Sequence, residues 1–260
     1  MILIRDILVL QQLLSQIRQN KKIGFVPTLG ALHAGHLSLI HRAKQENDSV
    51  VVSIFVNPTQ FNDSIDYQHY PRSLDSDKRI LEEIGIDYLF APKEKDMYPD
   101  EYDFLIKPNI NIASVLEGRA RPGHFEGMLT IVMKLLLIIQ PFAAYFGEKD
   151  YQQLKLIQQL TQSFFLLTTI VSCPTVREKS GLPLSSRNAR LTQDERRLME
   201  SIYQLLKRDS FSDLNSLLNK IMNRGVRVEY LEAMDNRIFL AMGVGQLRLI
   251  DNFLKETGPC

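Results

Sequence analysis

The stretch from Gly24 to Leu37, near the N-terminus, constrains the fold more than any other part of the chain. It starts inside an apolar run of strand type, Ile23 to Val26, which Pro27 ends, and continues through a turn with two glycines into an apolar-periodic helical segment over 37–45. Such a strand–turn–helix corner directs backbone N–H groups and a helix N-terminus at one point, which suits an anion such as a phosphate chain. His33 and His36 lie three residues apart, so they share a face of the first helical turn.

This corner does not identify its ligand by itself. It contains neither of the common phosphate motifs, G-x-x-x-x-G-K and G-x-G-x-x-G. An anion site, half of a zinc site and a plain structural corner with packed or solvated histidines are all compatible with it. The rest of the chain has to distinguish among these three interpretations.

Unusual residues also follow two further predicted strands. Residues 50–56 form a continuous β-branched and aromatic run, typical of a strand buried on both faces, and Asn57-Pro58-Thr59-Gln60-Phe61 follows it. Residues 141–146 are followed directly by Gly147-Glu148-Lys149-Asp150. The alternation of strands and helices predicts a doubly wound parallel sheet, in which ligands bind outside the carboxyl ends of the strands. The coincidence of polar and glycine residues at these ends therefore favours a functional site there.

Apolar periodicity and turn residues predict the remaining elements. We expect helices over 3–20, 75–84 with Asp75 as N-cap, 128–139, 151–162, 192–207 with a Thr192–Glu195 capping box and 211–223, and strands over 88–90, 166–171, 226–233 and 246–250. The composition changes after Cys173-Pro174 into a polar, Gly- and Pro-punctuated loop. We therefore predict an α/β protein with a Rossmann-like doubly wound parallel sheet over 1–175 and a smaller α+β domain over 176–260.

Charge and cysteine content limit the class of protein. A net charge of +1 over 260 residues argues against a broad electrostatic surface for nucleic acid or membrane. The apolar run over 128–146 is interrupted by Lys134 and by Gln140-Pro141, so we expect no transmembrane segment. Cys173 and Cys260 form neither a metal-ligand spacing nor a disulfide framework. We expect a cytoplasmic protein in a reducing compartment.

Linked motifs over residues 23–190 resemble the pantothenate synthetase (pantoate–β-alanine ligase) family, a branch of the H-x-G-H nucleotidyltransferase superfamily. The matching stretches occur in the family's order and at similar spacing. They are residues 27–36, 55–61, Tyr70-Pro71-Arg72, Glu117-Gly118 with residues 121–125, residues 146–153 and Leu184-Ser185-Ser186-Arg187-Asn188, with a looser match at residues 248–252.

The resemblance implies an ATP-dependent ligase. In this family the carboxylate of (R)-pantoate attacks the α-phosphate of ATP, which gives pantoyl adenylate and pyrophosphate. The amine of β-alanine then attacks the adenylate, which gives pantothenate and AMP. The resemblance further implies that the domain over 1–175 binds ATP and pantoate, that 176–260 is a lid domain, that Mg²⁺ is required, and that the enzyme is a homodimer.

The resemblance also assigns residues to these roles. The catalytic set it implies is His36, His33, Lys149, Arg187 and Ser185, which suits adenylation because that step needs preorganised cations and N–H donors at the phosphates. The implied ATP-binding residues are Leu29, Gly30, Ala31, Leu32, His33, Ala34, Gly35, His36, Gly147, Glu148, Lys149, Asp150, Val176, Leu184, Ser185, Ser186 and Arg187. The implied substrate-binding residues are Gln60, Gln153, Asn57 and Arg121.

Two positions depart from the family pattern. Leu29 replaces the usual Met, and its similar volume should still form an apolar wall for the gem-dimethyl group of pantoate. Some members carry two adjacent acids that help to hold Mg²⁺, whereas this chain has Ser76-Asp77 in that register. Asp77 is therefore the candidate metal ligand, with ATP phosphates as the other source of ligands.

Three alternatives stay open at this point. A different H-x-G-H nucleotidyltransferase would require more cations at its acceptor site than Gln60 and Gln153 provide. A metallohydrolase built on His33 and His36 lacks an evident third ligand. A non-catalytic nucleotide-binding module would not require the full set of His33, His36, Lys149 and Arg187. The sequence does not show which of the two histidines carries a proton during adenylation.

Overall fold

The computed structural model describes residues 1–259, and its contacts divide the chain into two compact units. The first unit comprises Met1–Gly147 and Gln152–Cys173. The second comprises Glu148–Tyr151 and the described chain from Pro174 onward. The ranges predicted from sequence did not anticipate that the four residues Glu148–Tyr151 group with the C-terminal part of the chain.

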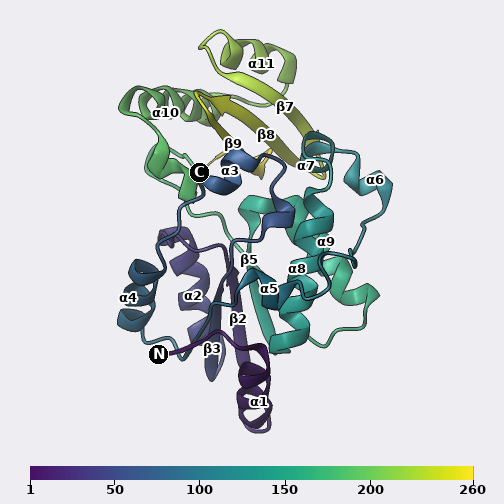
Figure 1. The fold of residues 1–260 in the computed structure, drawn as a ribbon. Coiled ribbons are helices and arrows are strands. Elements are labelled where there is room, and N and C mark those ends of the chain that lie inside the picture. The colour runs from purple at the N-terminus through teal and green to yellow at the C-terminus, as the bar shows by residue number, and fades with distance from the viewer. Residues whose placement is uncertain (260) are drawn as a thin grey trace. The chain divides into compact units, whose positions relative to one another are not determined.

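The first unit is built on a six-stranded parallel sheet, which confirms the predicted fold class (Figure 1). Its strand order is β1-β4-β3-β2-β5-β6. The strands are β1 (Ile2–Ile4), β2 (Ile23–Thr28), β3 (Ser49–Ile54), β4 (Tyr88–Phe90), β5 (Ala143–Gly147) and β6 (Thr169–Cys173). From β2 the chain proceeds to β3 and β4 on one side and later to β5 and β6 on the other. The switch point of the sheet therefore lies between β2 and β5.

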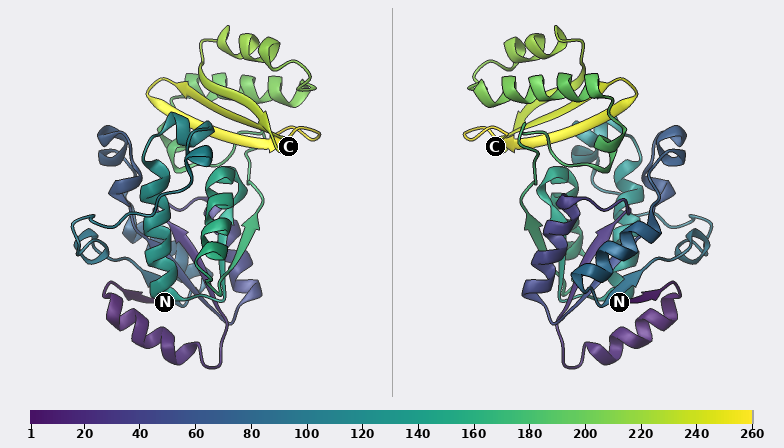
Figure 2. Two further views of the ribbon diagram at one scale, coloured as in Figure 1. Left: turned by 90° about the vertical axis from the view of Figure 1, so that its right-hand side faces the viewer. Right: turned by 90° about the vertical axis from the view of Figure 1, so that its left-hand side faces the viewer.

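Helices cover both faces of this sheet (Figure 2). α2 (Ala34–Glu46) and α4 (Leu74–Ile84) lie on one face, and α8 (His124–Ile139) lies on the other. The other helical segments of this unit are α1 (Ile7–Ile17), α3 (Ser64–Gln68), α5 (Glu94–Met97), α6 (Ile110–Ala113), α7 (Leu116–Ala120), α9 (Tyr151–Ser163) from its second residue onward, and the 3₁₀ turn η1 (Pro58–Gln60). The 3₁₀ turn η2 (Glu148–Asp150) belongs to the second unit.

The apolar strands pack against these helices. Val50, Val51 and Val52 of β3 are all at most 1% exposed, because both faces of the sheet are covered. On the face of α2 and α4, Val26 and Val52 belong to one core cluster with Ile40, Ala43 and Leu81. The continuous apolar run that predicted a doubly buried strand is thus explained by its position in the sheet.

α8 is the apolar segment that resembles a membrane span in sequence. It begins at His124, four residues before the predicted start, and Lys134 lies within it. The Lys134 ammonium donates to the Met97 carbonyl at 2.8 Å and contacts Asp100 at 3.3 Å. Among residues 1–259, no helix combines the length and the apolar character needed to cross a bilayer.

The second unit contains an antiparallel sheet of β7 (Arg227–Met234), β8 (Arg237–Val244) and β9 (Leu247–Leu254) in that order. Its helices are α10 (Gln193–Arg208) and α11 (Leu214–Met222), and η3 covers Ser186–Arg190. Ile202, Tyr203 and Leu206 of α10 pack with Leu240 of β8 in one buried cluster. The predicted capping box between Thr192 and Glu195 is present at the start of α10.

Several local predictions are corrected by the structure. Residues 3–20 are not one helix, because β1 pairs with β4 at the sheet edge and Asp6 then caps α1 by accepting from the Val9 amide at 3.0 Å. The N-cap of α4 is Ser73 rather than Asp75. Strand β8 was not predicted, although Asp235 and Asn236, both with positive φ, form the turn that precedes it.

Pro27 does not end the first core strand as predicted. β2 continues through Pro27 to Thr28, and both residues stay in register with β3. The pairing of β2 with β5 ends at Phe25, so beyond that point the strand has a ladder on one side only. A proline without an N–H is tolerated at such a position.

Candidate active site

The loop after β2 makes a tight left-handed turn before α2. Gly30 has φ +83° and Ala31 has φ +50°, so two consecutive residues adopt the left-handed region. The Gly30 amide donates to Thr28 Oγ1 at 3.1 Å, and the Thr28 hydroxyl donates to the Ser53 carbonyl at 2.8 Å. The turn is thereby anchored to the carboxyl end of β3.

The two predicted histidines lie together at the start of α2. His33 is the N-cap residue, and its Nδ1 accepts from the Gly35 amide at 3.1 Å. The rings of His33 and His36 stack with centroids 4.0 Å apart and an interplanar angle of 28°. Because Nδ1 of His33 is an acceptor, the ring proton of neutral His33 sits on Nε2, which can donate to a phosphate oxygen.

The amides of the turn itself are used differently from the prediction. The Ala31 amide donates to Asp77 Oδ2 and the Leu32 amide to Asp77 Oδ1, both at 2.8 Å. Four amides of the corner, those of Gly30, Ala31, Leu32 and Gly35, therefore donate to protein atoms. The donors that this corner presents to an anion are the imidazoles and the remaining helix N-terminus, and not the turn amides.

The carboxylate of Asp77, the predicted metal ligand, is bound to the turn that precedes α2. Its side chain is on the first turn of α4 and the residue is 1% exposed. Both carboxylate oxygens accept backbone amides, and Oδ2 also accepts from the Ser73 hydroxyl at 3.2 Å. Among residues 1–259, no group of three or more His, Cys, Asp or Glu side chains could hold a metal ion.

Three of the predicted substrate residues, Asn57, Gln60 and Arg121, lie together at η1, which follows β3. Arg121 Nη2 donates to the Gln60 carbonyl at 2.9 Å, and His124 Nδ1 lies 2.8 Å from the same oxygen. Arg121 also lies 3.6 Å from Glu117 in α7. The structure therefore brings Gln60 and Arg121 together, and it adds His124, whose role the sequence did not indicate beyond the family motif.

Asn57 is not placed to touch a substrate. It is 0% exposed, and its Oδ1 accepts from Tyr98 at 2.6 Å and from Thr59 at 3.1 Å. Its Nδ2 donates to Gln60 Oε1 and to the Gly127 carbonyl, both at 3.1 Å. The buried Asn57 side chain thus orients the Gln60 amide, and its predicted contact with substrate stays a prediction.

Two adjacent glutamines start α9, and they differ in burial. Gln153 is half-buried. Gln152 is buried, accepts from the Glu117 amide at 3.1 Å and donates to the carbonyls of Ile112 and Val115 at 3.0 and 3.1 Å. Gln152 thus ties α6 and α7 to α9, a structural role that the sequence did not indicate.

The strand order explains why these groups share one edge. β3, β2 and β5 are consecutive in the sheet, so the loops that carry Gln60, His33 and Gly147 leave neighbouring strands at the same end. This is the carboxyl end of a parallel sheet at its switch point, the usual ligand position in such folds.

In the second unit, two residues of the β-sheet hold the segment around Lys149. Asn252 Nδ2 donates to the carbonyls of Glu148 and Lys149, both at 2.8 Å. Arg237 forms an ion pair with Glu148 at 2.9 Å and lies over the Tyr151 ring at 4.2 Å. The Lys149 ammonium is 3.6 Å from Asp150 Oδ1. These contacts explain why Glu148–Tyr151 group with the C-terminal part of the chain.

In the second unit, the loop that carries the predicted ATP-binding residues from Val176 to Arg187 is held together by its own hydrogen bonds. The Leu184 amide donates to the Val176 carbonyl at 3.0 Å, which brings two predicted ATP residues together. Ser185 caps η3 by accepting from the Arg187 amide at 3.3 Å, and it keeps its own O–H proton as a donor. Asn188 is 5% exposed and donates to the Pro183 carbonyl at 2.9 Å.

Below this loop lies a buried ion pair. Arg177 donates to both oxygens of Asp251, at 2.6 and 2.9 Å, and the Asp251 side chain is 0% exposed. Burial raises the pKa of Asp251, and Arg177, Tyr203 and Lys149 oppose that shift. Burial also raises the pKa of Tyr203 well above its usual value, with the Asp251 charge as the next cause.

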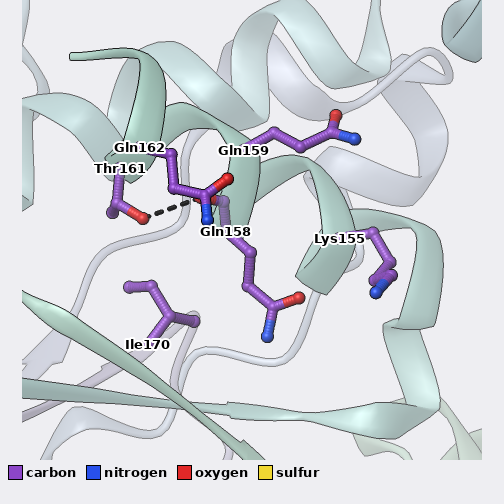
Figure 3. A pocket seen from close by; sticks show the side chains of 6 residues that line it. All are labelled: Lys155, Gln158, Gln159, Thr161, Gln162 and Ile170. Atoms are coloured by element: carbon purple, nitrogen blue, oxygen red, sulfur yellow. Dashed lines mark hydrogen bonds between the residues drawn. The ribbon is translucent and has the colours of Figure 1, made fainter. Parts of the chain in front are cut away.

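A separate hollow of about 440 Å³ lies beside α9 and β6 (Figure 3). Its lining is mainly polar, and Lys155 is its charged side chain. The lining residues are Lys155, Gln158, Gln159, Thr161, Gln162 and Ile170. None of the predicted site residues lines this hollow, so it is distinct from the arrangement described above.

Comparisons with known proteins show the family of the chain. The model of the family described as pantoate-beta-alanine ligase matches residues 2–254. The chain is 55% identical over 259 residues to a pantothenate synthetase of Francisella tularensis subsp. novicida, a match that covers 100% of this chain and 99% of that protein.

Two solved structures are similar over nearly the whole chain. The pantoate-beta-alanine ligase of Francisella tularensis, crystallised with beta-gamma ATP and beta-alanine, has a TM-score of 0.98 and 54% identity and covers 100% of both chains. The pantothenate synthetase of Thermus thermophilus has a TM-score of 0.87 and 35% identity, covering 98% of this chain and 100% of that one.

Proposed function

The chain belongs to the pantoate–β-alanine ligase family, and from this premise we propose that it condenses (R)-pantoate with β-alanine at the expense of ATP. The reaction passes through pantoyl adenylate and gives pantothenate, AMP and pyrophosphate. The observation that carries the proposal is the stacked His33–His36 pair at the start of α2, in a chain whose family match extends over residues 2–254.

The first half-reaction joins a carboxylate to the α-phosphate and expels pyrophosphate. Charge develops on the phosphate oxygens, so N–H donors and cations held in place lower the barrier. His33 offers Nε2–H, because its Nδ1 already accepts from Gly35. We assign His36, stacked on His33, to the reacting phosphate, and we assign Lys149, Ser185 and Arg187 to the phosphate chain on the strength of the family match.

The second half-reaction places an amine on the acyl carbon and releases AMP. Gln60 and Gln153 are assigned to pantoate because an amide can both donate to the carboxylate and accept from the hydroxyls. Asn57 fixes the Gln60 side chain, and Arg121 and His124 fix its backbone. Leu29 completes the site as an apolar wall for the gem-dimethyl group.

We further propose that ATP is used with Mg²⁺ and that phosphate oxygens supply its ligands, since both oxygens of Asp77 already accept backbone amides. Within this proposal, residues 1–175 bind ATP and pantoate and residues 176–260 act as a lid. A homodimer and a cytoplasmic location are part of the same proposal. The dimer is tested by light scattering, which should give twice the 29.9 kDa mass of the chain.

The test of the function is substrate dependence. Pyrophosphate should form from ATP only when pantoate is present, and AMP and pantothenate should form only when β-alanine is added as well. ATP turnover that is indifferent to pantoate would contradict the proposal. Transfer of AMP to a phosphate acceptor in place of pantoate would identify a different nucleotidyltransferase.

A further inference from the structure

We propose that Asp77 is a positioning residue of the nucleotide site: its carboxylate holds the left-handed turn at Gly30–Ala31 and so sets where α2 and its histidines begin. It acts through the turn and is not a ligand of the metal. This inference rests on the proposed function, because it assigns the histidines at the start of α2 to ATP binding.

The hydrogen bonds use both oxygens of the carboxylate. Oδ2 accepts from Ala31 and Oδ1 from Leu32, each at 2.8 Å, a distance typical of bonds to a charged acceptor. Asp77 is 1% exposed, so water does not compete for these oxygens. Bonds between an amide and a buried carboxylate are stronger than neutral ones, and losing them leaves unsatisfied groups in the protein interior.

The turn needs such a partner because of its backbone conformation. Ala31 has φ +50°, a region that a residue with a Cβ enters only at a cost in free energy. At Gly30, an added Cβ would lie 3.1 Å from Asp77 Oδ2 and 3.0 Å from Ile54 Cγ2, at φ +83°. The carboxylate therefore packs directly against the glycine, and it occupies the concave side on which successive amides would otherwise bind an external anion.

Helix α4 holds the Asp77 side chain in place. Asp77 lies in the first turn of α4, where its own amide donates to the Ser73 carbonyl at 2.8 Å, and the Ser73 hydroxyl donates back to Asp77 Oδ2. One turn further along, Leu81 is 0% exposed in the core that α4 shares with α2. The position of the turn is thus set by the docking of α4 on the sheet.

Asp77→Asn is the sharpest variant, because it keeps the shape of the side chain and replaces one oxygen with an NH₂ group. That group would face a backbone N–H, so one of the two bonds is lost and replaced by a donor–donor contact. Asp75→Asn, an exposed acid two residues earlier on the same helix, is the matched control.

Two measurements separate positioning from metal binding. In Asp77→Asn we expect kcat/KM for ATP to fall by roughly 10- to 100-fold while the Mg²⁺ concentration for half-maximal rate stays unchanged. By NMR in the absence of ligands, the amides of Ala31 and Leu32 should exchange at least about tenfold faster than in the unmodified protein. Asp75→Asn should change neither quantity.

A raised half-maximal Mg²⁺ concentration, with the rate restored by excess Mg²⁺, would overturn the proposal in favour of a metal ligand. Unprotected Ala31 and Leu32 amides in the unmodified protein would overturn it without any variant, even if Asp77→Asn failed to fold. The exchange experiment needs no ATP or pantoate. It therefore stands or falls separately from the pantoate-dependence test of the function.

Discussion

His33 and His36 share a helix face but differ in the hydrogen bonds available to them. His33 is locked as the N-cap of α2 by the Gly35 amide at its Nδ1. A doubly protonated His33 would place an N–H against that amide, so we expect His36 to be the histidine that exchanges a proton during the reaction. Which histidine carries the proton was open in the sequence, and this backbone contact is the reason for the prediction.

We therefore expect His36→Ala to lower pantoate-dependent pyrophosphate release by about 10²- to 10⁴-fold, because the variant removes a positioned proton donor at the phosphates. The far-UV circular dichroism should be unchanged. His41→Ala, an exposed histidine on the same helix, serves as the control and should retain the rate. A His36→Ala rate within about twofold of the unmodified enzyme would remove His36 from the mechanism.

At the scale of elements, the end of α2 opposite to the histidines is tied to β5. The Tyr145 hydroxyl donates to Glu46 Oε2 at 2.9 Å and accepts from Asn47 Nδ2 at 2.7 Å. Glu46 in turn pairs with Arg42, which donates to the Ser172 carbonyl of β6 at 2.7 Å. α2 is therefore held against two neighbouring strands, which keeps its N-terminus in place.

Tyr145→Phe should lower the free energy of unfolding by about 1–3 kcal/mol near pH 8, because a hydrogen bond to a charged group is lost. Burial, and then the bond to Glu46, raise the pKa of Tyr145 from 10.0 to about 12. The folded state thus holds the phenol proton more tightly than the unfolded state. This contribution is complete below pH 10 and is lost as the pH rises toward 12.

Urea unfolding of both proteins at pH 8 and pH 11 measures this effect. The difference in unfolding free energy between the unmodified protein and Tyr145→Phe should be smaller at pH 11. A difference that is constant across this range would show that Tyr145 titrates alike in both states. The same comparison cancels the titration of the other tyrosines, which both proteins share.

A second contact between elements, that of α8 with η1, determines the position of Gln60. α8 approaches η1 so closely that a Cβ at Gly127 would lie 2.2 Å from the Thr59 carbonyl oxygen and 2.8 Å from the Gln60 nitrogen. No side chain fits between the two backbones. Gly127 therefore determines how near η1, and with it Gln60, lies to the helix.

Gly127→Ala should displace η1 and raise KM for pantoate by roughly 10- to 100-fold, because the error in position is on the order of 1 Å. KM for ATP should change by less than about twofold, since the contact lies at Gln60 and away from the histidine turn. Steady-state kinetics with each substrate varied in turn measures both values. Leu137→Ala, at a 47% exposed position of α8, is the control. Equal changes in both KM values would contradict this assignment.

At the scale of the whole molecule, the two compact units are interleaved in sequence. The segment Glu148–Tyr151 follows β5 of the first unit, yet its contacts are with β8 and β9 of the second. The Arg248–Asn252 stretch, which resembled the family only loosely, thus has a physical role. Asn252 holds the carbonyl of Lys149, and Asp251 pairs with Arg177 next to Val176.

Asn252→Ala should raise KM for ATP by about tenfold or more, because two carbonyls lose their donor and Lys149 loses its fixed position. KM for pantoate should stay within about twofold. Lys255→Ala, an exposed residue just after β9, provides the comparison. If Asn252→Ala left KM for ATP unaltered while lowering the melting temperature, the contact would be structural only.

The parallel α/β sheet, the corner with His33 and His36 and the capping box at Thr192 could be predicted from the sequence, because each depends on residues close together in the chain. The family could be predicted as well, because its motifs are short and follow one another in a fixed order. Periodicity and caps arise from neighbours three or four positions apart. The sequence did not show that Asp77 accepts hydrogen bonds from the amides of Ala31 and Leu32, or that Asn57 is buried and bonded to Gln60. It also did not show that Glu148–Tyr151 belong with the C-terminal strands. In each case the partner is distant in the chain: Asp77 is 46 positions from Ala31, Tyr98 is 41 positions from Asn57, and Asn252 is 104 positions from Glu148. Such partners meet only when helices and strands pack against one another in the tertiary structure.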